Sequence, residues 1–190
     1  MKYDIILAGV GGQGVLSLSV IIATAAMKEG LTVKQSEVHG MSQRGGAVVA
    51  NLRLSDREVA SDLIPHGTAS MILSLEPMES LRYVHFLAPE GSIVTSSNPV
   101  RNIADYPDLE TILGKVRQVG RSVVVDAGDL AQKAGSKLAT NMVMIGAASH
   151  RLPLAAEKLE DAIRTTFARK GDAVVETNLE AFRAGREAAR

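Results

Sequence analysis

The chain has 190 residues, of which 46% are hydrophobic and 3% aromatic, and its 21 basic side chains balance 21 acidic ones. This length and hydrophobic content are sufficient for one domain with a buried core, whereas zero net charge and few aromatic rings argue against a nucleic-acid-binding surface. The chain has no Cys, which excludes disulfides, a cysteine nucleophile and any iron–sulphur cluster ligated by its own side chains.

Residues 5–27 contain no charged side chain and are long enough for a membrane helix. However, four glycines between positions 9 and 14 interrupt this segment, and Asp4 stands where a secretory signal would carry positive charge. A buried strand, a glycine turn and a buried helix account for the segment better. Together with the absence of Cys, this interpretation favours a cytoplasmic protein without membrane contact.

The apolar pattern and the turn residues predict strands and helices that alternate along the chain. Strands are expected at residues 4–8, 31–36, 47–54, 70–75, 92–95 and 122–125, with a hairpin extension at 57–60. Helices are expected at residues 15–27, 76–86, 126–134, 157–168 and 172–190, with an apolar segment at 140–150. This alternation predicts an α/β protein with a Rossmann-like, mostly parallel sheet and flanking helices. We expect residues 1–190 to form a single domain whose last part, from about residue 150, is a helical extension.

The segment GVGGQG at residues 9–14 matches the G-x-G-x-x-G pattern, follows an expected strand and opens an expected helix. Glycines permit a tight turn and a close approach of a ligand, and a helix N-terminus offers amide donors to an anion. Three interpretations remain open: tight packing of the helix on the sheet, a site for a phosphate or another anionic cofactor, and a nicotinamide or flavin site. The candidate cofactor-binding residues are Gly9, Gly11, Gly12, Gln13 and Gly14.

A dinucleotide site also needs an acidic residue at the end of the second strand to bind the ribose. Glu37 stands at that position in the sequence. Against this interpretation, the second expected strand runs into a Gly-rich loop and a third strand, where a Rossmann half would have a crossover helix. Nothing downstream resembles a substrate domain.

The segment EVHGMSQRGG at residues 37–46 concentrates an acid, a histidine, an arginine and three glycines in one expected loop. Loops of this composition commonly contact a ligand or a partner. His39 could transfer protons near neutral pH and Arg44 could bind a carboxylate or phosphate, or Arg44 could simply pair with Glu37. The candidate substrate or subunit contacts are Glu37, His39, Gly40, Met41, Ser42, Gln43, Arg44, Gly45 and Gly46. No catalytic residue and no metal ligand are assigned.

Four phrases in this order carry a family resemblance: GVGGQGVLSLS (9–19), SEVHGMSQRGGAVVANLR (36–53), LEPMESLR (75–82) and NLEAFRAG (178–185). The chain resembles the small, or beta, subunits of the indolepyruvate:ferredoxin oxidoreductases, within the gamma-type subunits of the 2-oxoacid:ferredoxin oxidoreductases. The glycine loop and an Arg-Gly-Gly are shared across the wider family, whereas HGMSQR and EPME point to the indolepyruvate type. Asp62 stands where the resemblance leads us to expect proline, which affects a turn and not the chemistry.

The resemblance implies a small non-redox subunit of an enzyme that converts a 2-oxo acid and coenzyme A to acyl-CoA and carbon dioxide while reducing ferredoxin. The implied substrate is indolepyruvate or another aryl pyruvate. Thiamine diphosphate, magnesium and iron–sulphur clusters would belong to a large partner subunit, and coenzyme A would be the co-substrate. This chain is expected to bind no cofactor alone, and it is not expected to be catalytic alone.

The implied partner is that large subunit, and ferredoxin would be reached through the complex. The isolated chain would then expose an apolar patch or form a homodimer. The competing hypotheses are a free-standing Rossmann-like protein that binds a nucleotide such as NAD or FAD, and a regulatory module without catalysis.

Overall fold

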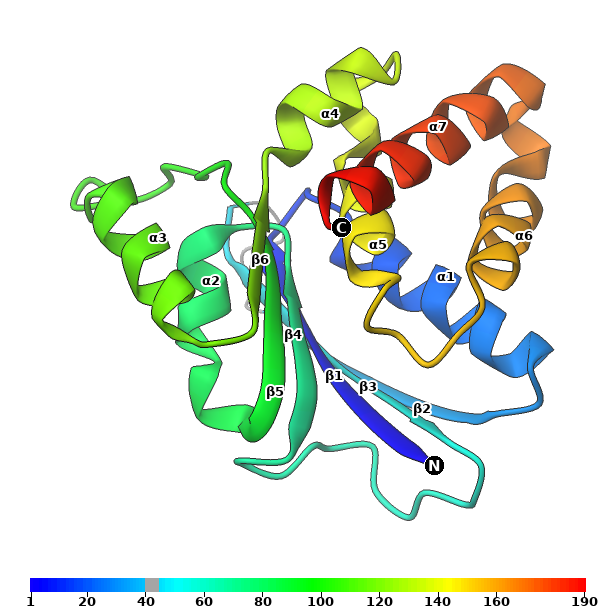
Figure 1. Cartoon of the computed structure of the whole chain (residues 1–190), viewed down its shortest axis with the longest axis horizontal. Coiled ribbons are helices and arrows are strands. Elements are labelled where there is room, and N and C mark those ends of the chain that lie inside the picture. The colour runs from blue at the N-terminus through cyan, green and yellow to red at the C-terminus, as the bar shows by residue number, and fades with distance from the viewer. Residues whose placement is uncertain (40–44) are drawn as a thin grey trace.

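The computed structural model describes residues 1–39 and 45–190. Six strands in these residues form one sheet: β1 (Lys2–Val10), β2 (Thr32–His39), β3 (Ala47–Ser55), β4 (Ala69–Ser74), β5 (Leu87–Ser96) and β6 (Ser122–Val125). Their order is β2-β3-β1-β4-β5-β6, with β1, β4, β5 and β6 parallel to one another and β3 antiparallel to both β1 and β2. The predicted α/β class with a mostly parallel sheet is confirmed (Figure 1).

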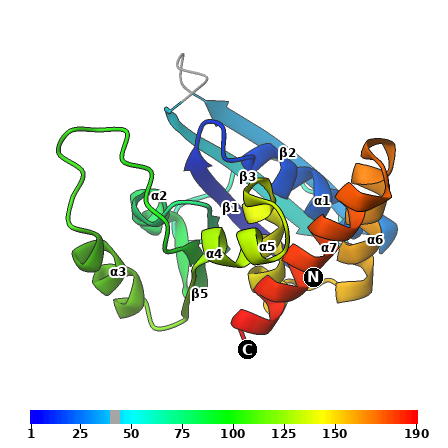
Figure 2. The ribbon, with the colours of Figure 1, turned by 90° about the horizontal axis from the view of Figure 1, so that it is seen from above.

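Helices cover both faces of the sheet (Figures 1 and 2). They are α1 (Val15–Lys28), α2 (Pro77–Arg82), α3 (Leu109–Gln118), α4 (Ala127–Lys133), α5 (Thr140–Ala148), α6 (Ala156–Phe167) and α7 (Asp172–Ala188), with short 3-10 turns η1 (Val84–Phe86), η2 (Lys137–Ala139) and η3 (Ala168–Lys170). α1 and α5 lie on one face, with α6 packed on α1 and α7 packed on α5, and α2 and α3 lie on the other face. α6 and α7, which follow residue 150, form an outer layer on the side of α1 and α5.

β1 is the central strand, and its burial explains its continuous apolar sequence. Ile5 and Leu7 point into the larger hydrophobic core beneath α1 and α5, whereas Ile6 points into the smaller core on the opposite face. When a strand is covered on both faces, the side chains on each face are buried, so apolar residues do not alternate with polar ones along it. The uncharged segment 5–27 is thus a strand, a turn and the largely buried helix α1, as predicted. Within the described ranges, we find no helix with both the length and the apolar character needed to span a membrane.

A buried ion pair ties β1 to β3 and to the chain that follows β3. Asp4 and Arg53 stand opposite each other in the sheet, and their side chains meet at 3.0 and 3.1 Å. The same guanidinium donates to the carbonyl oxygens of Ser61 and Leu63. The expected hairpin extension at residues 57–60 is wrong, because this segment is irregular and the chain beyond it is held by Arg53 instead of a strand partner.

Two helices differ from the sequence expectation. α3 was not expected, although Asp108 caps it by accepting a hydrogen bond from the Thr111 N–H at 2.9 Å, and Ile112, Leu113 and Val116 form its buried side. The helix expected at 76–86 ends at Arg82 and continues only as the turn η1. Both differences concern elements on the face away from α1.

We expect Gly146→Ala to lower the free energy of unfolding by about 3 kcal/mol, because α5 and α7 cross with no room for a side chain. A Cβ at Gly146 would lie 1.9 Å from the Phe182 carbonyl oxygen, and one at Gly185 would lie 1.9 Å from the Val143 carbonyl oxygen. Urea unfolding followed by circular dichroism measures the effect.

Gly114→Ala on α3 is the matched control, because a Cβ there meets nothing within 4 Å. It should raise the free energy of unfolding by about 0.5–1 kcal/mol, since alanine has the higher helix propensity. Equal stabilities for the Gly146 and Gly114 variants would contradict the close crossing.

Candidate functional site

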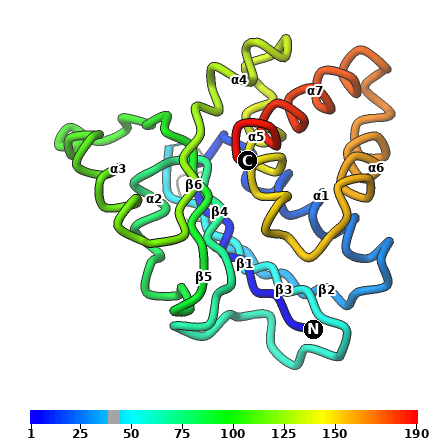
Figure 3. Tube along the Cα trace, viewed as in Figure 1, coloured from blue at the N-terminus to red at the C-terminus, as the bar shows by residue number. Residues whose placement is uncertain are grey.

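The site lies where β1 and β4 end side by side. The chain leaves β1 into α1 on one face of the sheet and leaves β4 into α2 on the other, which makes this edge a topological switch point (Figures 1 and 3). Ligands of α/β proteins commonly bind at such points. Residues 9–14, which we call the glycine loop, occupy this position.

Gln13 joins the ends of the two strands. Its side-chain Oε1 accepts a hydrogen bond from the Val10 N–H at 2.8 Å, and its Nε2 donates to the Leu75 carbonyl oxygen at 3.1 Å. The amide thereby occupies the gap between β1 and β4. Both polar ends of Gln13 are engaged with the protein, so its side chain holds the loop in place.

The glycines of the loop have different roles. A Cβ at Gly9 would lie 2.9 Å from Val15 Cγ2 and 3.0 Å from the Gln13 Oε1, so this position allows close packing of α1 on β1. Gly14, with φ +88°, is the N-cap of α1 in a left-handed conformation that favours glycine. Gly12, with φ +103°, is exposed and has no other described atom within 4 Å of an added Cβ. Gly12 is therefore open to a ligand.

The glycine loop is hydrogen-bonded to the end of the segment at residues 37–46, which we call the polar loop and which precedes β3. The Gly11 N–H donates to the Gly46 carbonyl oxygen at 2.8 Å, and the Gly45 N–H donates to the Gly11 carbonyl oxygen at 3.3 Å. Asn102 Nδ2 also donates to the Gly45 carbonyl oxygen. The two segments singled out in the sequence therefore meet at one site.

Other predicted contacts in the polar loop lie outside the described part of the chain. They are the residues Gly40, Met41, Ser42, Gln43 and Arg44 and the side chain of His39. The alternative pairing of Arg44 with Glu37 falls in the same segment. These assignments stay predictions.

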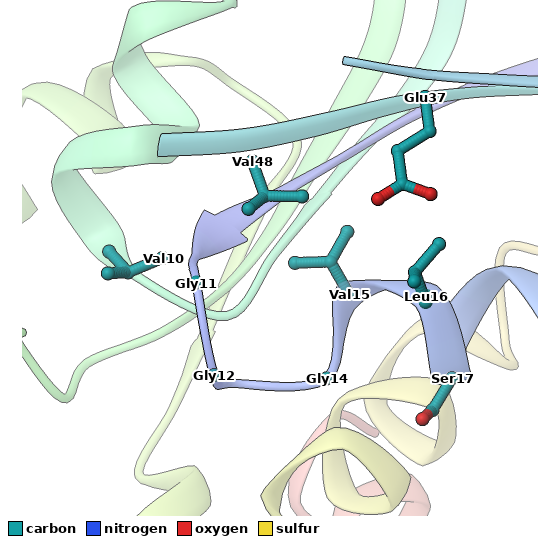
Figure 4. A pocket seen from close by; sticks show the side chains of 9 residues that line it. All are labelled: Val10, Gly11, Gly12, Gly14, Val15, Leu16, Ser17, Glu37 and Val48. Carbon is teal, nitrogen blue, oxygen red and sulfur yellow. The ribbon is translucent and has the colours of Figure 1, made fainter. Parts of the chain in front are cut away.

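A cavity of about 420 Å³ opens beside the glycine loop, and we call it the loop cavity. Its lining residues are Val10, Gly11, Gly12, Gly14, Val15, Leu16, Ser17, Glu37 and Val48. Figure 4 shows the Glu37 carboxylate reaching from β2 toward Val15 and Leu16, while Ser17 points away from it. Glu37 is the ionisable group among otherwise apolar or small residues. The cavity therefore suits a largely apolar group that can also bind backbone amides or one carboxylate.

Five of these lining residues were missed in the sequence: Val10, Val15, Leu16, Ser17 and Val48. Val15 and Leu16 directly follow the glycine loop, and Val48 comes two residues after the polar loop. Their closeness in the sequence to the two loops was the signal that could have identified them as lining residues. Apolar residues in a helix and a strand are otherwise typical of a core, so composition alone does not identify them as cavity walls.

Glu76 anchors the loop that carries Asn102. Its carboxylate is fully buried, caps α2 through the Glu79 N–H at 2.8 Å and accepts hydrogen bonds from the Val100 N–H and the Tyr106 hydroxyl. Burial, together with the hydrogen bond to Glu76, raises the pKa of the Tyr106 hydroxyl, which therefore stays protonated as the donor. The phrase EPME thus has a local structural role: it holds the chain beside the site.

The strand order argues against the dinucleotide interpretation. β3 lies between β1 and β2, so Glu37 near the end of β2 is separated from β1 by a whole strand. In a dinucleotide site the second strand lies directly beside the first. The gap between the ends of β1 and β4 is also occupied by Gln13.

Sequence comparison decides the family. The family described as pyruvate ferredoxin/flavodoxin oxidoreductase matches residues 4–188. The chain belongs to this family. The indolepyruvate oxidoreductase subunit IorB of Archaeoglobus fulgidus is 41% identical, and the match covers 97% of this chain and 94% of the relative. The same subunit of Pyrococcus horikoshii is 39% identical, with 100% and 96% covered. The family resemblance is confirmed, and the chain is a subunit of a 2-oxoacid:ferredoxin oxidoreductase.

Solved structures share the fold of this family member. The pyruvate oxidoreductase subunit PORC of Thermotoga maritima aligns with a TM-score of 0.77 at 26% identity, covering 98% of this chain and 96% of that one. The 2-oxoglutarate:ferredoxin oxidoreductase of Magnetococcus marinus aligns with a TM-score of 0.78 at 23% identity, covering 99% of this chain but 31% of that chain. The same fold therefore occurs as a separate subunit and as part of a longer chain.

We expect Gln13→Ala to lower the free energy of unfolding by about 1–3 kcal/mol, because it removes both hydrogen bonds of the bridge and leaves the Val10 N–H without its acceptor. Urea unfolding measures the loss, and hydrogen exchange at the Val10 amide should become faster.

Gln118→Ala, at the exposed end of α3, is the control and should change stability by less than about 0.5 kcal/mol. A Gln13→Ala variant with unchanged stability and unchanged exchange at Val10 would contradict the bridging role.

Proposed function

We propose that the chain is the small subunit of an indolepyruvate:ferredoxin oxidoreductase, which converts indolepyruvate or another aryl pyruvate and coenzyme A to the acyl-CoA and carbon dioxide while reducing ferredoxin. The observation that carries the proposal is the near full-length similarity to IorB subunits, at 41% identity in one archaeal relative. The phrases HGMSQR and EPME support the aryl pyruvate as substrate.

The redox chemistry belongs to the large partner subunit. The chain has no Cys to ligate an iron–sulphur cluster. Across residues 1–39 and 45–190, no group of three or more His, Asp or Glu side chains is placed to hold a metal ion. The residues present therefore do not fit a cluster, and we assign no electron-transfer step to this chain. Thiamine diphosphate, magnesium and the clusters are proposed for the partner, and ferredoxin is reached through the complex.

The loop cavity is the proposed contact with coenzyme A. The structure of the Magnetococcus marinus enzyme was determined with 2-oxoglutarate, coenzyme A and succinyl-CoA bound. In this chain the apolar wall of Val15, Leu16 and Val48 suits the chain of a pantetheine arm, and exposed backbone at Gly12 suits its amides. Glu37 and residues 39–46 are the proposed contacts with substrate or partner.

An apolar surface supports docking of a partner. Leu16, Val20 and Met27 are exposed along one side of α1, at spacings of four and seven residues. β2, which is in contact with α1, is an edge strand that pairs only with β3 among the described strands. Exposed apolar rows of this kind mark interaction sites.

A pull-down of the tagged chain from its native host tests the subunit assignment. The large thiamine- and cluster-bearing subunit should co-elute, and the eluate should reduce a viologen dye without oxygen only when a 2-oxo acid and coenzyme A are both present. Indolepyruvate should be the better substrate, and pyruvate is the comparison. If the chain elutes alone and without activity although the partner is expressed, the assignment is overturned.

Val48→Trp tests the loop cavity in the assembled complex. The indole ring would occupy the cavity, so the KM for coenzyme A should rise about tenfold or more, equivalent to about 1.4 kcal/mol of lost binding, while partner co-elution is retained. Thr32→Trp adds the same ring at the exposed far end of β2 and should leave the KM unchanged. An unchanged KM in the Val48 variant would exclude the loop cavity as the coenzyme contact and leave the family assignment intact.

A further inference from the structure

Hydrogen bonds join three segments at the edge of the sheet where β1, β4 and β5 end. Two of them are the glycine loop and the end of the polar loop, which are joined directly between Gly11 and residues 45 and 46. The third is formed by residues 97–108, which connect β5 to α3 and which we call the β5–α3 loop (Figure 1). None of the residues that line the loop cavity comes from this third segment.

Asn102 connects the β5–α3 loop to the polar loop. Its side-chain Nδ2 donates to the Gly45 carbonyl oxygen, and the Gly45 N–H donates to the Gly11 carbonyl oxygen at 3.3 Å. Gly11 in turn lines the loop cavity. Asn102 is exposed, so water competes for its amide, and its own loop has to hold the side chain in place.

Glu76 holds the β5–α3 loop on both sides of Asn102. Its buried carboxylate accepts hydrogen bonds from the Val100 N–H at 3.3 Å and from the Tyr106 hydroxyl. The Asn102 N–H donates to the Val100 carbonyl oxygen at 2.9 Å, which closes a three-residue turn at this point. The backbone of Asn102 is therefore fixed relative to a carboxylate in the protein interior.

These contacts close into a ring. Leu75, the residue before Glu76, accepts the hydrogen bond that Gln13 Nε2 donates at 3.1 Å. The ring thus runs from the glycine loop through Gln13, Leu75 and Glu76 to the β5–α3 loop. Asn102 and Gly45 complete it back to the glycine loop. Asn102 is the exposed side chain in this ring, so its substitution opens the ring without disturbing the core.

We propose that Asn102 is a positioning residue for the binding of coenzyme A: through the Gly45 backbone it fixes the Gly11 side of the loop cavity. Glu76 and Tyr106 hold Asn102 in place. The proposal rests on the proposed function, in which the loop cavity contacts the coenzyme. A preorganised cavity loses little freedom on binding, so a looser wall weakens binding and leaves the reacting groups unchanged. Asn102 therefore acts on the KM for coenzyme A and not on kcat.

Kinetics of the assembled complex test the proposal. Asn102→Ala should raise the KM for coenzyme A about three- to tenfold, the effect of one lost hydrogen bond, with kcat at saturating coenzyme unchanged. Asn102→Asp keeps the side-chain shape but places a carboxylate against the Gly45 carbonyl oxygen, so its KM should rise at least as much. Gln118→Ala, which removes an exposed amide from the end of α3, is the control and should leave both constants unchanged.

A double variant separates positioning from a general loosening of the fold. Tyr106→Phe removes a hydroxyl that holds the β5–α3 loop, and it should raise the KM for coenzyme A less than Asn102→Ala does. The double variant should match Asn102→Ala alone, because without the Asn102 amide there is nothing left for Tyr106 to position. Two effects that simply multiply would contradict a shared route through Asn102.

Hydrogen exchange of the full chain measures the structural step by itself. In Asn102→Ala the Gly45 amide, which donates to Gly11, should exchange faster. The amide of Ile72, in the buried centre of β4, should exchange at the same rate as in the unmodified chain. Faster exchange at both positions would indicate global destabilisation and would overturn the positioning role.

Unchanged exchange at Gly45 also overturns the proposal, as does faster exchange there with an unchanged KM for coenzyme A. A fall in kcat without a rise in KM has the same consequence. The proposed function is tested separately by the pull-down and by Val48→Trp. If Val48→Trp raises the KM and Asn102→Ala does not, the proposal fails alone. If neither raises it, the coenzyme contact at the loop cavity fails as well.

Discussion

The antiparallel pairing of β3 with β1 is the constraint on which the site depends. Its register places Val10 opposite Ala47, so the loops that leave β1 and enter β3 start side by side and are joined by backbone hydrogen bonds. The same register sets Asp4 opposite Arg53 in a buried ion pair. Because side chains alternate along a strand, a slip of one residue would separate this pair and turn Val48 out of the loop cavity. A register in which Asp4 and Arg53 do not meet would leave the buried guanidinium of Arg53 without its carboxylate, which strongly penalises such registers.

Within that frame the glycine loop acts mainly as a rigid support. Gly9 and Gly14 allow α1 to begin close to the sheet, and Gln13 fastens the loop to the end of β4. At Gly12, an added Cβ would have no described atom within 4 Å. A loop held in this way presents its backbone with little freedom left to lose on binding, which is the physical basis of preorganised recognition. The glycine loop has the same G-x-G-x-x-G pattern as dinucleotide-binding proteins. In those proteins the second strand lies beside the first, whereas here β3 lies beside β1.

The first turn of α1 separates two cavities of unlike character. One is apolar with the carboxylate of Glu37, and the other has Lys170, Asn141 and the starts of three helices. The wall formed by α7 depends on its close crossing with α5, which Gly146 and Gly185 permit. The phrase NLEAFRAG near the C-terminus therefore contributes to the shape of a cavity far away in the sequence.

The sequence by itself determined the α/β class, the family and the two loops of the site, because buried strands, glycine turns and helix starts have local signatures. Its local patterns missed α3 and wrongly extended β3 over residues 57–60, where Arg53 holds the following chain. Only the tertiary structure decided that Gln13 bonds to Leu75 and that Asn141 lies against Gly14. These contacts join residues more than 60 positions apart. They depend on strand order and helix packing, which the spacing of residues along the chain does not encode.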